Sequence, residues 1–475
     1  MSWNWLIIAA HLVLSLPAAV HAMLYKRDPR AALGWVAACL FFPFLGPLSY
    51  YMFGINRIQT HARKLAHASL FRLRISHERG AIPGDSLTDT QGLDPHLKRL
   101  VHVSDRVTSH PLTAGNKIEI LQNGEQAYPA MLTAINGAVD HVLLITYLFE
   151  SDVIGEAFVA ALTAAHQRGV KVLVIVDGIG ELYSRPRISR QLCKAGIRAV
   201  RFLPPKLLPP SFFINLRNHR KILVVDGEYG FTGGMNIGAR HLLASTGRRR
   251  TRDLHFRLQG PAVTQLQAIF AEDWRFVTGE SLALKDTTHE ARGSISCRWI
   301  SDGPNEDLDR ISLILMGAIS AAQREIVIIT PYFLPSREMI ASLQSAALRG
   351  VDIAIILPEQ SNLRFIDWAS RNLLWELLVH DAKVYYQPPP FAHTKLFMVD
   401  GVYAQVGSAN IDPRSLRLNF ELNLEIIGAD AVAPIAEYSG HIRRHSTPVT
   451  LAEVEGRRLA ARIRDAACWL FLPYL

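Results

Sequence analysis

The sequence predicts an α/β protein made of two similar half-domains, each a β-sheet flanked by helices, preceded by an N-terminal transmembrane hairpin. Three observations support this prediction. Two long uncharged runs begin the chain, β-rich apolar runs alternate with helical patterns from about residue 117, and one polar motif occurs twice. With 475 residues, the chain is long enough to bury a large core or to form two domains.

The first predicted element is a pair of apolar runs, at about residues 3–24 and 31–55, and neither contains Lys, Arg, Asp or Glu. Each run is long enough to span a bilayer, which takes about 20 residues. Aromatic residues lie near the ends of the pair, where an interfacial belt is expected: Trp3, Trp5, Tyr50 and Tyr51. Pro43, Gly46 and Pro47 predict a kinked or re-entrant second span. We therefore interpret residues 1–56 as a membrane hairpin.

Two other interpretations of the N-terminus stay open. A cleaved signal peptide would end at the weak site Val20-His21-Ala22, although no Lys or Arg precedes its apolar run. A buried pair of soluble helices is the second alternative. For the orientation, the basic residues that follow the second run outnumber those between the runs. The positive-inside rule then places the large C-terminal part in the cytoplasm.

The composition points to an anionic partner. The chain has a formal net charge of +9 and is 49% hydrophobic, which favours either nucleic acid or an anionic lipid surface. The four cysteines are far apart in the sequence, so neither a disulfide framework nor a zinc site is indicated. No H-E-x-x-H motif and no Walker-type glycine loop occurs. We therefore expect no metal and no cofactor.

The remaining elements follow in order. A polar juxtamembrane linker with short helices is predicted for residues 57–113, a first half-domain for 114–290, a second for 291–460, and an apolar tail for 461–475. Each half-domain repeats the order strand, helix, strand before a longer connection. The predicted segments are 142–147, 154–167 and a strand from 168 in the first half, and 326–330, 339–348 and a strand from 349 in the second.

The duplicated motif carries the chemistry. It combines a histidine, a lysine two residues on, an aspartate five residues after the lysine, and a Gly-Gly or Gly-Ser pair followed by an asparagine. Its members are His219, Lys221, Asp226, Gly233, Gly234 and Asn236 in the first copy, and His393, Lys395, Asp400, Gly407, Ser408 and Asn410 in the second. Two such sets predict one active site built from both halves, in which cations hold a phosphate and an imidazole attacks it.

Each motif also predicts a β-hairpin, because an Asp-Gly dipeptide separates two apolar runs. With Asp226-Gly227 as a two-residue turn, His219 pairs with Gly234 and Lys221 with Thr232. The same register places His393 across from Ser408. A polar strand face with an ordinary turn is the alternative interpretation, and the second copy at identical spacing argues against it. For Asp226 and Asp400, the spacing leaves a turn role and a catalytic role equally open.

The two H-x-K-x4-D motifs resemble those of the phospholipase D superfamily, over about residues 110–450. Within it, the hairpin and the stretches 410–415 (NIDPRS) and 419–421 (NFE) are similar to the bacterial cardiolipin synthases. The resemblance implies an enzyme of the bacterial inner membrane that works without a metal through a covalent phosphohistidine. It also implies that an acidic residue past each motif, Asp253 and Glu421 by position, holds the histidine of that motif. Gly234 departs from the serine of many members.

The resemblance and the motif together assign roles. One neutral imidazole attacks phosphorus, while the other, protonated, donates to the departing alkoxide and later accepts the proton of the incoming alcohol. The resemblance favours His219 as the attacking residue. The predicted catalytic residues are His219, Lys221, Asp226, His393, Lys395 and Asp400; the predicted phosphate ligands are Asn236, Asn410 and Ser408; and Asp253 and Glu421 orient the histidines.

The leading functional hypothesis is transfer of a phosphatidyl group between two phosphatidylglycerol molecules, giving cardiolipin and glycerol. The alternatives are a hydrolytic phospholipase D, a membrane-bound nuclease, which a bilayer anchor disfavours, and a non-catalytic scaffold that binds anionic lipid. Three further segments bear on the substrate. Loop 203–213 (LPPKLLPPSFF) is either a buried connection or dips into the bilayer, run 247–252 (GRRRTR) is either a solvated loop or recruits headgroups, and residues 468–475 are a candidate interfacial anchor.

Overall fold

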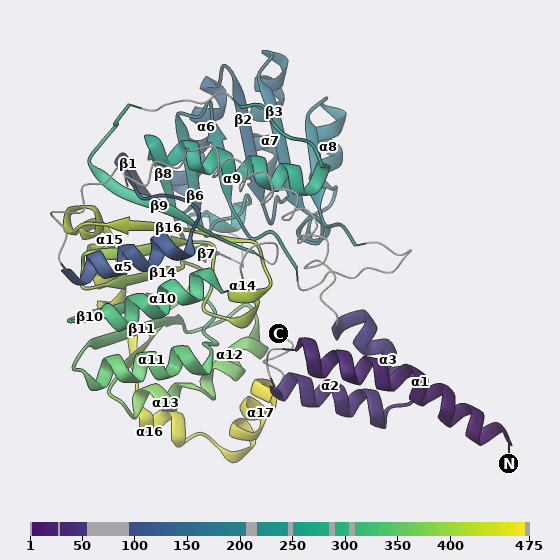
Figure 1. Ribbon diagram of the computed structural model, residues 1–475. Helices are drawn as coiled ribbons and strands as arrows, with labels where there is room; N and C mark the ends of the chain where they lie inside the picture. The colour runs from purple at the N-terminus through teal and green to yellow at the C-terminus, as the bar shows by residue number, and fades with distance from the viewer. Residues whose placement is uncertain are drawn as a thin grey trace, which may run out of the picture. The chain divides into compact units, whose positions relative to one another are not determined.

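The computed structural model describes residues 2–26, 29–54, 95–205, 216–245, 250–284, 290–303 and 309–470 (Figure 1). The described residues up to Gly54 belong to one compact unit, and those from Pro95 onward, Pro205 excepted, belong to a second. Several segments with predicted roles lie wholly or largely outside the described residues. They are the linker up to residue 94, most of loop 203–213 and the tail beyond Leu470; of run 247–252, the first half also lies outside.

The first unit contains helices α1 (Ser2–Tyr25), α2 (Pro29–Phe41) and α3 (Leu45–Ser49) and a π-helical segment, η1 (Tyr50–Gly54). By length and composition, α1 is the one described helix that could cross a membrane. The second apolar run is broken after α2, where Pro43 lacks an amide hydrogen and Phe44 has a φ of 60°. The predicted interruption of this run is confirmed, and a second crossing of the bilayer stays a prediction.

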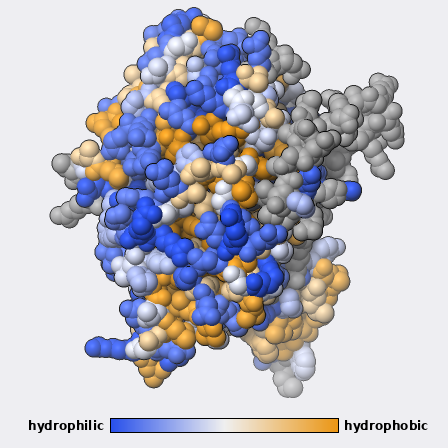
Figure 2. Space-filling view, turned by 90° about the vertical axis from the view of Figure 1, so that its left-hand side faces the viewer, coloured by the Kyte–Doolittle hydropathy of each residue, from blue (hydrophilic) through white to orange (hydrophobic). Residues whose placement is uncertain are grey.

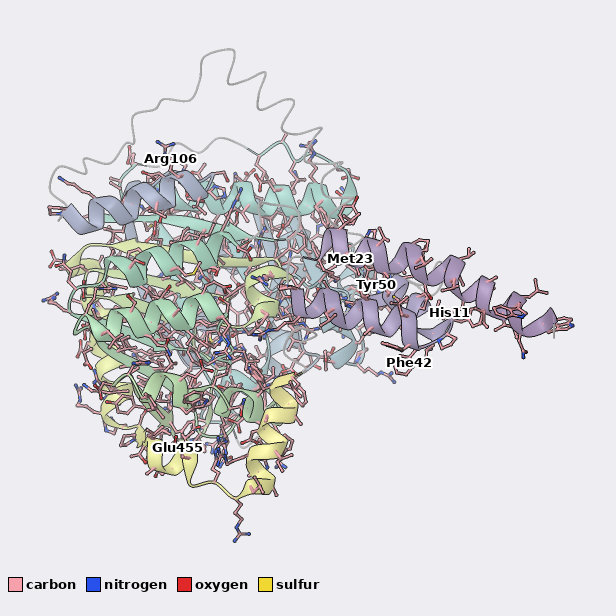
Figure 3. The ribbon with its side chains drawn as sticks, turned by 60° about the horizontal axis from the view of Figure 1, so that its bottom comes forward. His11, Met23, Phe42, Tyr50, Arg106 and Glu455 are labelled. Carbon is pink, nitrogen blue, oxygen red and sulfur yellow. The ribbon has the colours of Figure 1, made fainter. Side chains whose placement is uncertain are left out.

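Helices α1 and α2 pack through small residues and one aromatic residue. Ala22 and Cys39 are fully buried between them. Tyr50, labelled in Figure 3, closes this cluster. Its hydroxyl lies 2.7 Å from Nδ1 of His21, and its ring lies 5.2 Å from that of Trp35. The outward side chains of α1, including Trp3 and Trp5, are exposed and apolar. An apolar outer surface of this kind suits lipid better than water.

Removing residues 1–56 is expected to end the integral attachment to the bilayer without unfolding the α/β part, and peripheral binding of the truncated protein to anionic vesicles is compatible with this prediction. The three core clusters of the second unit contain no described residue from this segment. Thermal unfolding followed by circular dichroism, together with co-sedimentation with phosphatidylglycerol vesicles at low and high salt, tests this, because salt screens surface charge within about 10 Å at 0.1 M. An insoluble, unfolded truncation would contradict the boundary, and full vesicle retention at high salt would place the anchor elsewhere.

The second unit is built on one continuous sheet with the strand order β17-β12-β11-β10-β14-β15-β16-β9-β1-β8-β6-β5-β2-β3-β4. The strands of its first half are β1 (Thr113–Gln122), β2 (His141–Thr146), β3 (Lys171–Asp177), β4 (Arg198–Phe202), β5 (Ile222–Val225), β6 (Tyr229–Gly233) and β8 (Leu254–Gln259). Those of its second half are β9 (Ile295–Asp302), β10 (Glu325–Ile329), β11 (Asp352–Pro358), β12 (Lys383–Gln387), β14 (Leu396–Val399), β15 (Tyr403–Gly407), β16 (Glu421–Ile427) and β17 (Thr447–Val449).

The strand order shows the duplication directly. From the junction outward, the first half runs β1, β8, β6, β5, β2, β3, β4, and the second runs β9, β16, β15, β14, β10, β11, β12 in matching order. The halves join edge to edge where β1 pairs antiparallel with β9. This arrangement confirms the predicted α/β class with two similar halves, and it relates them by a pseudo-twofold at the junction.

Helices cover both faces of the sheet (Figure 1). Helices of the first half are α6 (Asn123–Gly137), α7 (Val153–Gln167), η3 (Gly180–Tyr183), α8 (Ile188–Lys194), η4 (Ala239–His241) and α9 (Pro261–Thr278). Those of the second are α10 (Arg310–Ala321), α11 (Arg337–Leu348), α12 (Arg364–Arg371), α13 (Leu374–Leu378), α14 (Pro413–Arg417), α15 (Ala429–Arg444), α16 (Leu451–Glu455) and α17 (Leu459–Leu470). Helix α5 (Pro95–Val107), which bears Arg106 (Figure 3), lies in the predicted linker and packs on α10.

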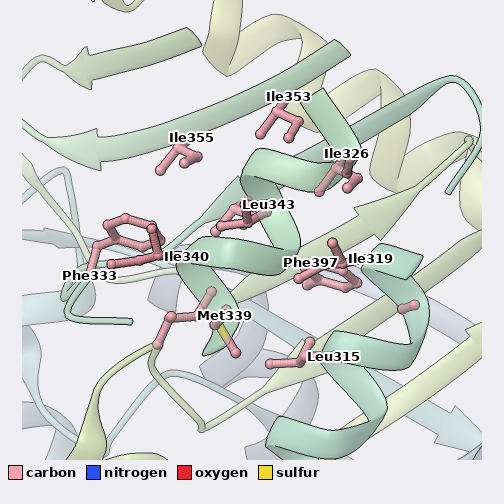
Figure 4. Close-up of a cluster of buried hydrophobic side chains, with 14 of the residues drawn as sticks. Leu315, Ile319, Ile326, Phe333, Met339, Ile340, Leu343, Ile353, Ile355 and Phe397 are labelled. Atoms are coloured by element: carbon pink, nitrogen blue, oxygen red, sulfur yellow. The ribbon is translucent and has the colours of Figure 1, made fainter. Parts of the chain in front are cut away.

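Alternate residues of each strand fill the two layers. In β10, Ile326 and Ile328 face the cluster under α10 and α11, whereas Val327 and Ile329 face the cluster under α9 and α15. Figure 4 shows the first of these layers, in which Leu315, Ile319, Met339, Ile340 and Leu343 pack against Ile326, Ile353, Ile355 and Phe397. Burial of each such side chain stabilises the fold by about 1.5–3 kcal/mol. The outer face in Figure 2 is mainly hydrophilic, with smaller hydrophobic areas.

Both motif hairpins are present, but their register differs from the prediction by one residue. Val225 pairs with Tyr229 and Val399 with Tyr403, so each loop contains three residues, 226–228 and 400–402. Asp226 and Gly227 both have positive φ, 55° and 66°, as the Asp-Gly turn requires. The additional loop residue shifts every pair beyond it. Continued along the strands, this register sets Lys221 level with Gly233 instead of Thr232.

Candidate active site

The two halves exchange backbone contacts beside each motif histidine. Asn218 pairs with Phe420 in a parallel bridge, and the N–H of His219 donates to the carbonyl of Phe420 at 2.9 Å. In the same way, β13 (Phe391–Ala392) pairs with β7 (Thr251–Arg252), and the N–H of His393 donates to the carbonyl of Arg252 at 2.8 Å. Each histidine is thus held next to the chain segment that precedes the acidic residue of the opposite half.

The acidic partners of the histidines are therefore crossed. Nδ1 of His393 lies 2.8 Å from Oδ2 of Asp253, and Nδ1 of His219 lies 3.2 Å from Oε1 of Glu421. The expectation that each acid holds the histidine of its own motif is wrong, because the parallel pairings between halves determine which carboxylate reaches which ring. Asp253 and Glu421 do contact the motif imidazoles, as predicted, but across the junction.

The two lysines lie beside the imidazoles and are nearly fully buried. Nζ of Lys221 donates to the carbonyl of His219 at 2.6 Å, and Nζ of Lys395 lies 2.9 Å from the ring nitrogens of His393. Burial lowers the pKa of Lys221 to about 8, against the opposing effect of Glu421. Burial also lowers the pKa of Lys395 to about 7. Their proton affinity will rise once an anionic phosphate replaces water in the site.

The two histidine–acid pairs differ in their electrostatic surroundings. Burial, and then the neighbouring Lys395 and Lys221, hold the pKa of His393 well below its usual value, so its ring is neutral near pH 7. Burial raises the pKa of its partner Asp253. Burial also opposes ionisation of Glu421, but His219, Lys221 and the Ser408 hydroxyl outweigh it, and the pKa of Glu421 is lowered. The ionised Glu421 stabilises positive charge on His219.

Ser408 and Gly234 occupy equivalent positions in the two motifs, and each lies beside one of the two carboxylates. The hydroxyl of Ser408 donates to Oε2 of Glu421 at 2.5 Å and accepts from the N–H of Leu422 at 2.9 Å. Ser408 therefore holds the carboxylate of Glu421, and its role as a phosphate ligand stays a prediction. At Gly234 a Cβ atom would lie 2.5 Å from Oδ2 of Asp253, so a serine does not fit beside that carboxylate.

The asparagines of the motifs lie at the ends of the same hairpins. Oδ1 of Asn236 accepts from the N–H of Leu148 at 3.1 Å, which directs its amide nitrogen away from this contact. Nδ2 of Asn410 donates to the hydroxyl of Ser415 at 3.2 Å, and within the described part of the chain its Oδ1 has no hydrogen-bond partner. Both side chains are buried, and their role as phosphate ligands stays a prediction.

The motif aspartates lie far from the imidazoles. The carboxylate of Asp226 accepts three backbone hydrogen bonds of 2.8–2.9 Å, from Val139, Asp140 and His141. Asp400 accepts the equivalent three, of 2.7–2.9 Å, from residues 323–325. Seven residues of chain separate each from its histidine, about 20 Å along a strand. The structure thus corrects their catalytic assignment: they fasten the hairpin turns to the starts of β2 and β10.

Several residues of the site were not predicted from the sequence. Buried Arg220, between the motif histidine and lysine, donates to Oδ1 of Asp273 at 2.7 Å and to the carbonyl of Glu421 at 3.1 Å. The ring of Tyr147 lies 4.4 Å from that of His219, and Nδ2 of Asn419 lies 3.3 Å from Nδ1 of His219. The position of Arg220 within the motif was a usable signal, whereas nothing local indicates Tyr147. Among the described residues, no group of three or more His, Cys, Asp or Glu could hold a metal ion.

Activity is expected to fall as the pH rises through 7 to 8 and beyond, because Lys395 and then Lys221 lose the protons that let them stabilise a phosphate. A kcat/KM profile should decline about tenfold per pH unit once a required proton is lost. In Lys395→Arg the cation persists, so the alkaline decline should begin at higher pH, even if the rate at pH 7 is lower. Lys171→Arg, at an exposed position on β3, is the matched control and should leave the profile unchanged.

Comparison with known proteins agrees with this geometry. The family described as "Cardiolipin synthase, PLD-like domain" matches residues 131–274 and 315–442, and the family described as "Phospholipase_D-nuclease N-terminal" matches residues 13–54. A cardiolipin synthase of Geobacillus thermodenitrificans is 31% identical over 458 residues, covering 95% of this chain and 90% of the relative. Cardiolipin synthase A of Pseudomonas aeruginosa is 33% identical over 425 residues, covering 88% and 85%.

Among solved structures, the phosphatidylserine synthase of Haemophilus influenzae superposes with a TM-score of 0.60 at 14% identity, over 81% of this chain and 100% of that one. At this identity the likeness concerns the fold alone. The family matches and the relatives, by contrast, extend over most of the chain and include both motifs. The chain belongs to the cardiolipin synthase family, built on the phospholipase D-like fold.

Proposed function

We propose that this protein is a bacterial membrane phosphatidyltransferase that makes cardiolipin and glycerol from two molecules of phosphatidylglycerol. The observation that carries the proposal is the pair of imidazoles, each held by a carboxylate of the opposite half and flanked by a buried lysine. The names of the relatives, which are cardiolipin synthases of bacteria, support the same reaction. Two imidazoles in one site suit a double displacement at phosphorus.

In the first step, the neutral imidazole forms a bond to phosphorus while the bond from phosphorus to the glycerol oxygen breaks. The other imidazole, protonated, gives its proton to that oxygen, and glycerol leaves. In the second step, the same imidazole takes the proton of the glycerol hydroxyl on a second phosphatidylglycerol. The hydroxyl oxygen then displaces the histidine nitrogen from phosphorus, and cardiolipin is formed.

The two roles match the two environments of the site. The lowered pKa of His393 favours it as the neutral nucleophile, in contrast to the choice suggested by the resemblance. The ionised Glu421 favours His219 as the residue that carries the proton. Lys221 and Lys395 supply positive charge to the phosphoryl oxygens as negative charge develops on them.

Purified protein incubated with phosphatidylglycerol as the sole lipid tests the proposal. We expect cardiolipin and glycerol in equal amounts. Phosphatidic acid as the main lipid product would indicate a hydrolytic phospholipase D instead. No turnover of lipid, with binding to anionic vesicles intact, would indicate a scaffold.

Activity is expected to survive metal chelation, because the two buried lysines supply the charge that a metal ion would otherwise provide. The measurement is the rate of cardiolipin formation before and after dialysis against EDTA. A rate within about twofold of the untreated enzyme is the expected result. Strict loss in EDTA that a single divalent ion restores would contradict this prediction.

We also propose that both apolar runs cross the membrane and that the α/β part lies in the cytoplasm. The excess of basic residues after the second run supports this orientation. Protease added to inverted membrane vesicles should then degrade the α/β part, while protease added to intact spheroplasts should spare it. The opposite pattern would reverse the orientation.

A further inference from the structure

Exposed apolar side chains lie in equivalent positions of both halves, beyond the C-terminal ends of β3 and β11, on the side of the sheet that carries the site. Leu182 is the fifth residue after β3, and Leu363 is the fifth residue after β11, the matching strand. Leu182 is 45% exposed, its neighbour Tyr183 70% and Leu363 47%. The pseudo-twofold thus repeats an exposed leucine in two segments that share no sequence motif: η3 in the first half and the loop before α12 in the second.

These segments lie close to the imidazoles. In the first half, the backbone at Gly180 abuts Tyr147, since a Cβ there would lie 1.8 Å from the Tyr147 carbonyl oxygen, and the Tyr147 ring stacks edge-on to His219. In the second half, the hydroxyl of Tyr332 donates to Oδ1 of Asn362 at 2.7 Å. The Tyr332 ring lies 6.4 Å from that of Phe391, which lies 5.8 Å from His393. Aromatic rings therefore link each segment to an imidazole.

The end of α17 adds another exposed apolar residue, Leu470, near Leu363 on this side of the sheet. Leu470 is 66% exposed, and its neighbour Trp469 lies under the guanidinium of Arg337, at the start of α11, 5.7 Å from it. Helix α17 packs along α12, which begins directly after Leu363. We call the four residues Leu182, Tyr183, Leu363 and Leu470 the apolar rim.

Exposed cations accompany the apolar rim. Arg185 and Arg190 follow Tyr183, and Arg364 follows Leu363, and all three are exposed. The carboxylate of Glu181, the acid nearest to Tyr183 in the sequence, is buried and accepts from the N–H of Ser189 at 2.9 Å. Leucine and tyrosine flanked by arginine are typical of surfaces that bind the interface of anionic bilayers.

We propose that the apolar rim inserts into the interface of an anionic phospholipid bilayer and brings lipid phosphates to the two imidazoles. This inference rests on the function proposed above, since a phosphodiester held in a bilayer reaches a buried site only if the edge around that site meets the headgroups. Hydrophobic contact supplies attraction at short range, and the arginines select anionic lipid.

The kinetic test compares Leu182→Gln/Leu363→Gln with a matched control, Val139→Gln/Leu348→Gln, in the full chain. Val139 and Leu348 are exposed apolar residues, one in each half. They precede the N-terminal ends of β2 and β11, opposite to the strand ends that carry the rim. We expect the rim variant to lose about tenfold or more in turnover of phosphatidylglycerol in vesicles, but less than twofold in detergent micelles, where single lipids reach the site. The control should match the wild type in both.

Equal losses in vesicles and micelles, an unaffected rim variant, or an equal loss in the control would each overturn the proposal. A change of oligomeric state in the rim variant would instead assign the rim to a contact between two copies. If the wild type turned over phosphatidylglycerol neither in vesicles nor in micelles, the proposed function would be refuted. A binding measurement, which needs no turnover, then tests the role of the rim separately.

That measurement places a fluorophore at Leu182→Cys or at Val139→Cys, in a background where the exposed Cys193 is replaced by serine. Lipids with a quencher on the acyl chain report whether the fluorophore enters the bilayer. In phosphatidylglycerol vesicles we expect several-fold stronger quenching at position 182 than at 139, and little difference in zwitterionic vesicles. Equal quenching at both positions in phosphatidylglycerol would overturn the proposal irrespective of any activity.

Discussion

Replacing either His219 or His393 with alanine is expected to lower the turnover of phosphatidylglycerol by about 10⁴-fold or more. Each imidazole is held by a carboxylate of the opposite half, so neither can take over the position of the other. The measurement is the rate of cardiolipin formation from phosphatidylglycerol. His441→Ala, which removes an exposed histidine on α15, is the matched control and should leave the rate unchanged.

The same variants identify the nucleophile. A phosphatidyl ester of para-nitrophenol has a leaving group that departs without a proton, so it needs the nucleophile but not the acid. With His393 as nucleophile, His219→Ala should still release a burst of nitrophenol and trap a phosphohistidine, and His393→Ala should release none. The reverse pattern would assign the attack to His219. Near-normal turnover of phosphatidylglycerol by His393→Ala would refute the shared site altogether.

Replacing Glu421 with glutamine is expected to lower kcat by about 10²- to 10⁴-fold, the range seen when the carboxylate that orients a catalytic histidine is neutralised. Asp253→Asn should have a loss of the same order. Asp226→Asn and Asp400→Asn are the contrasting controls, because their carboxylates bind backbone N–H groups at the turns. We expect these two to lower the temperature of unfolding while kcat stays within a few-fold. A large kcat loss at correct folding would return the motif aspartates to the catalytic set.

The sequence by itself determined the class of the fold and most of the site. The strand at β2, the helix at α7 and their counterparts β10 and α11 were predicted within a few residues, because a local pattern of apolar residues decides each of them. The repeated spacing identified both His/Lys pairs and both hairpins. It did so because a strand places residues two apart on one face, whatever surrounds it.

Only the tertiary structure decided which groups meet. The pairing of Asp253 with His393, and of Glu421 with His219, joins residues more than a hundred positions apart. It follows from the parallel pairings between the two halves, Asn218 with Phe420 and β13 with β7, which no local period encodes. One loop residue decided the hairpin register, and the buried starts of β2 and β10 gave Asp226 and Asp400 their roles. Local periodicity determines the direction in which a side chain points, but its partner is set by packing between segments distant in the sequence.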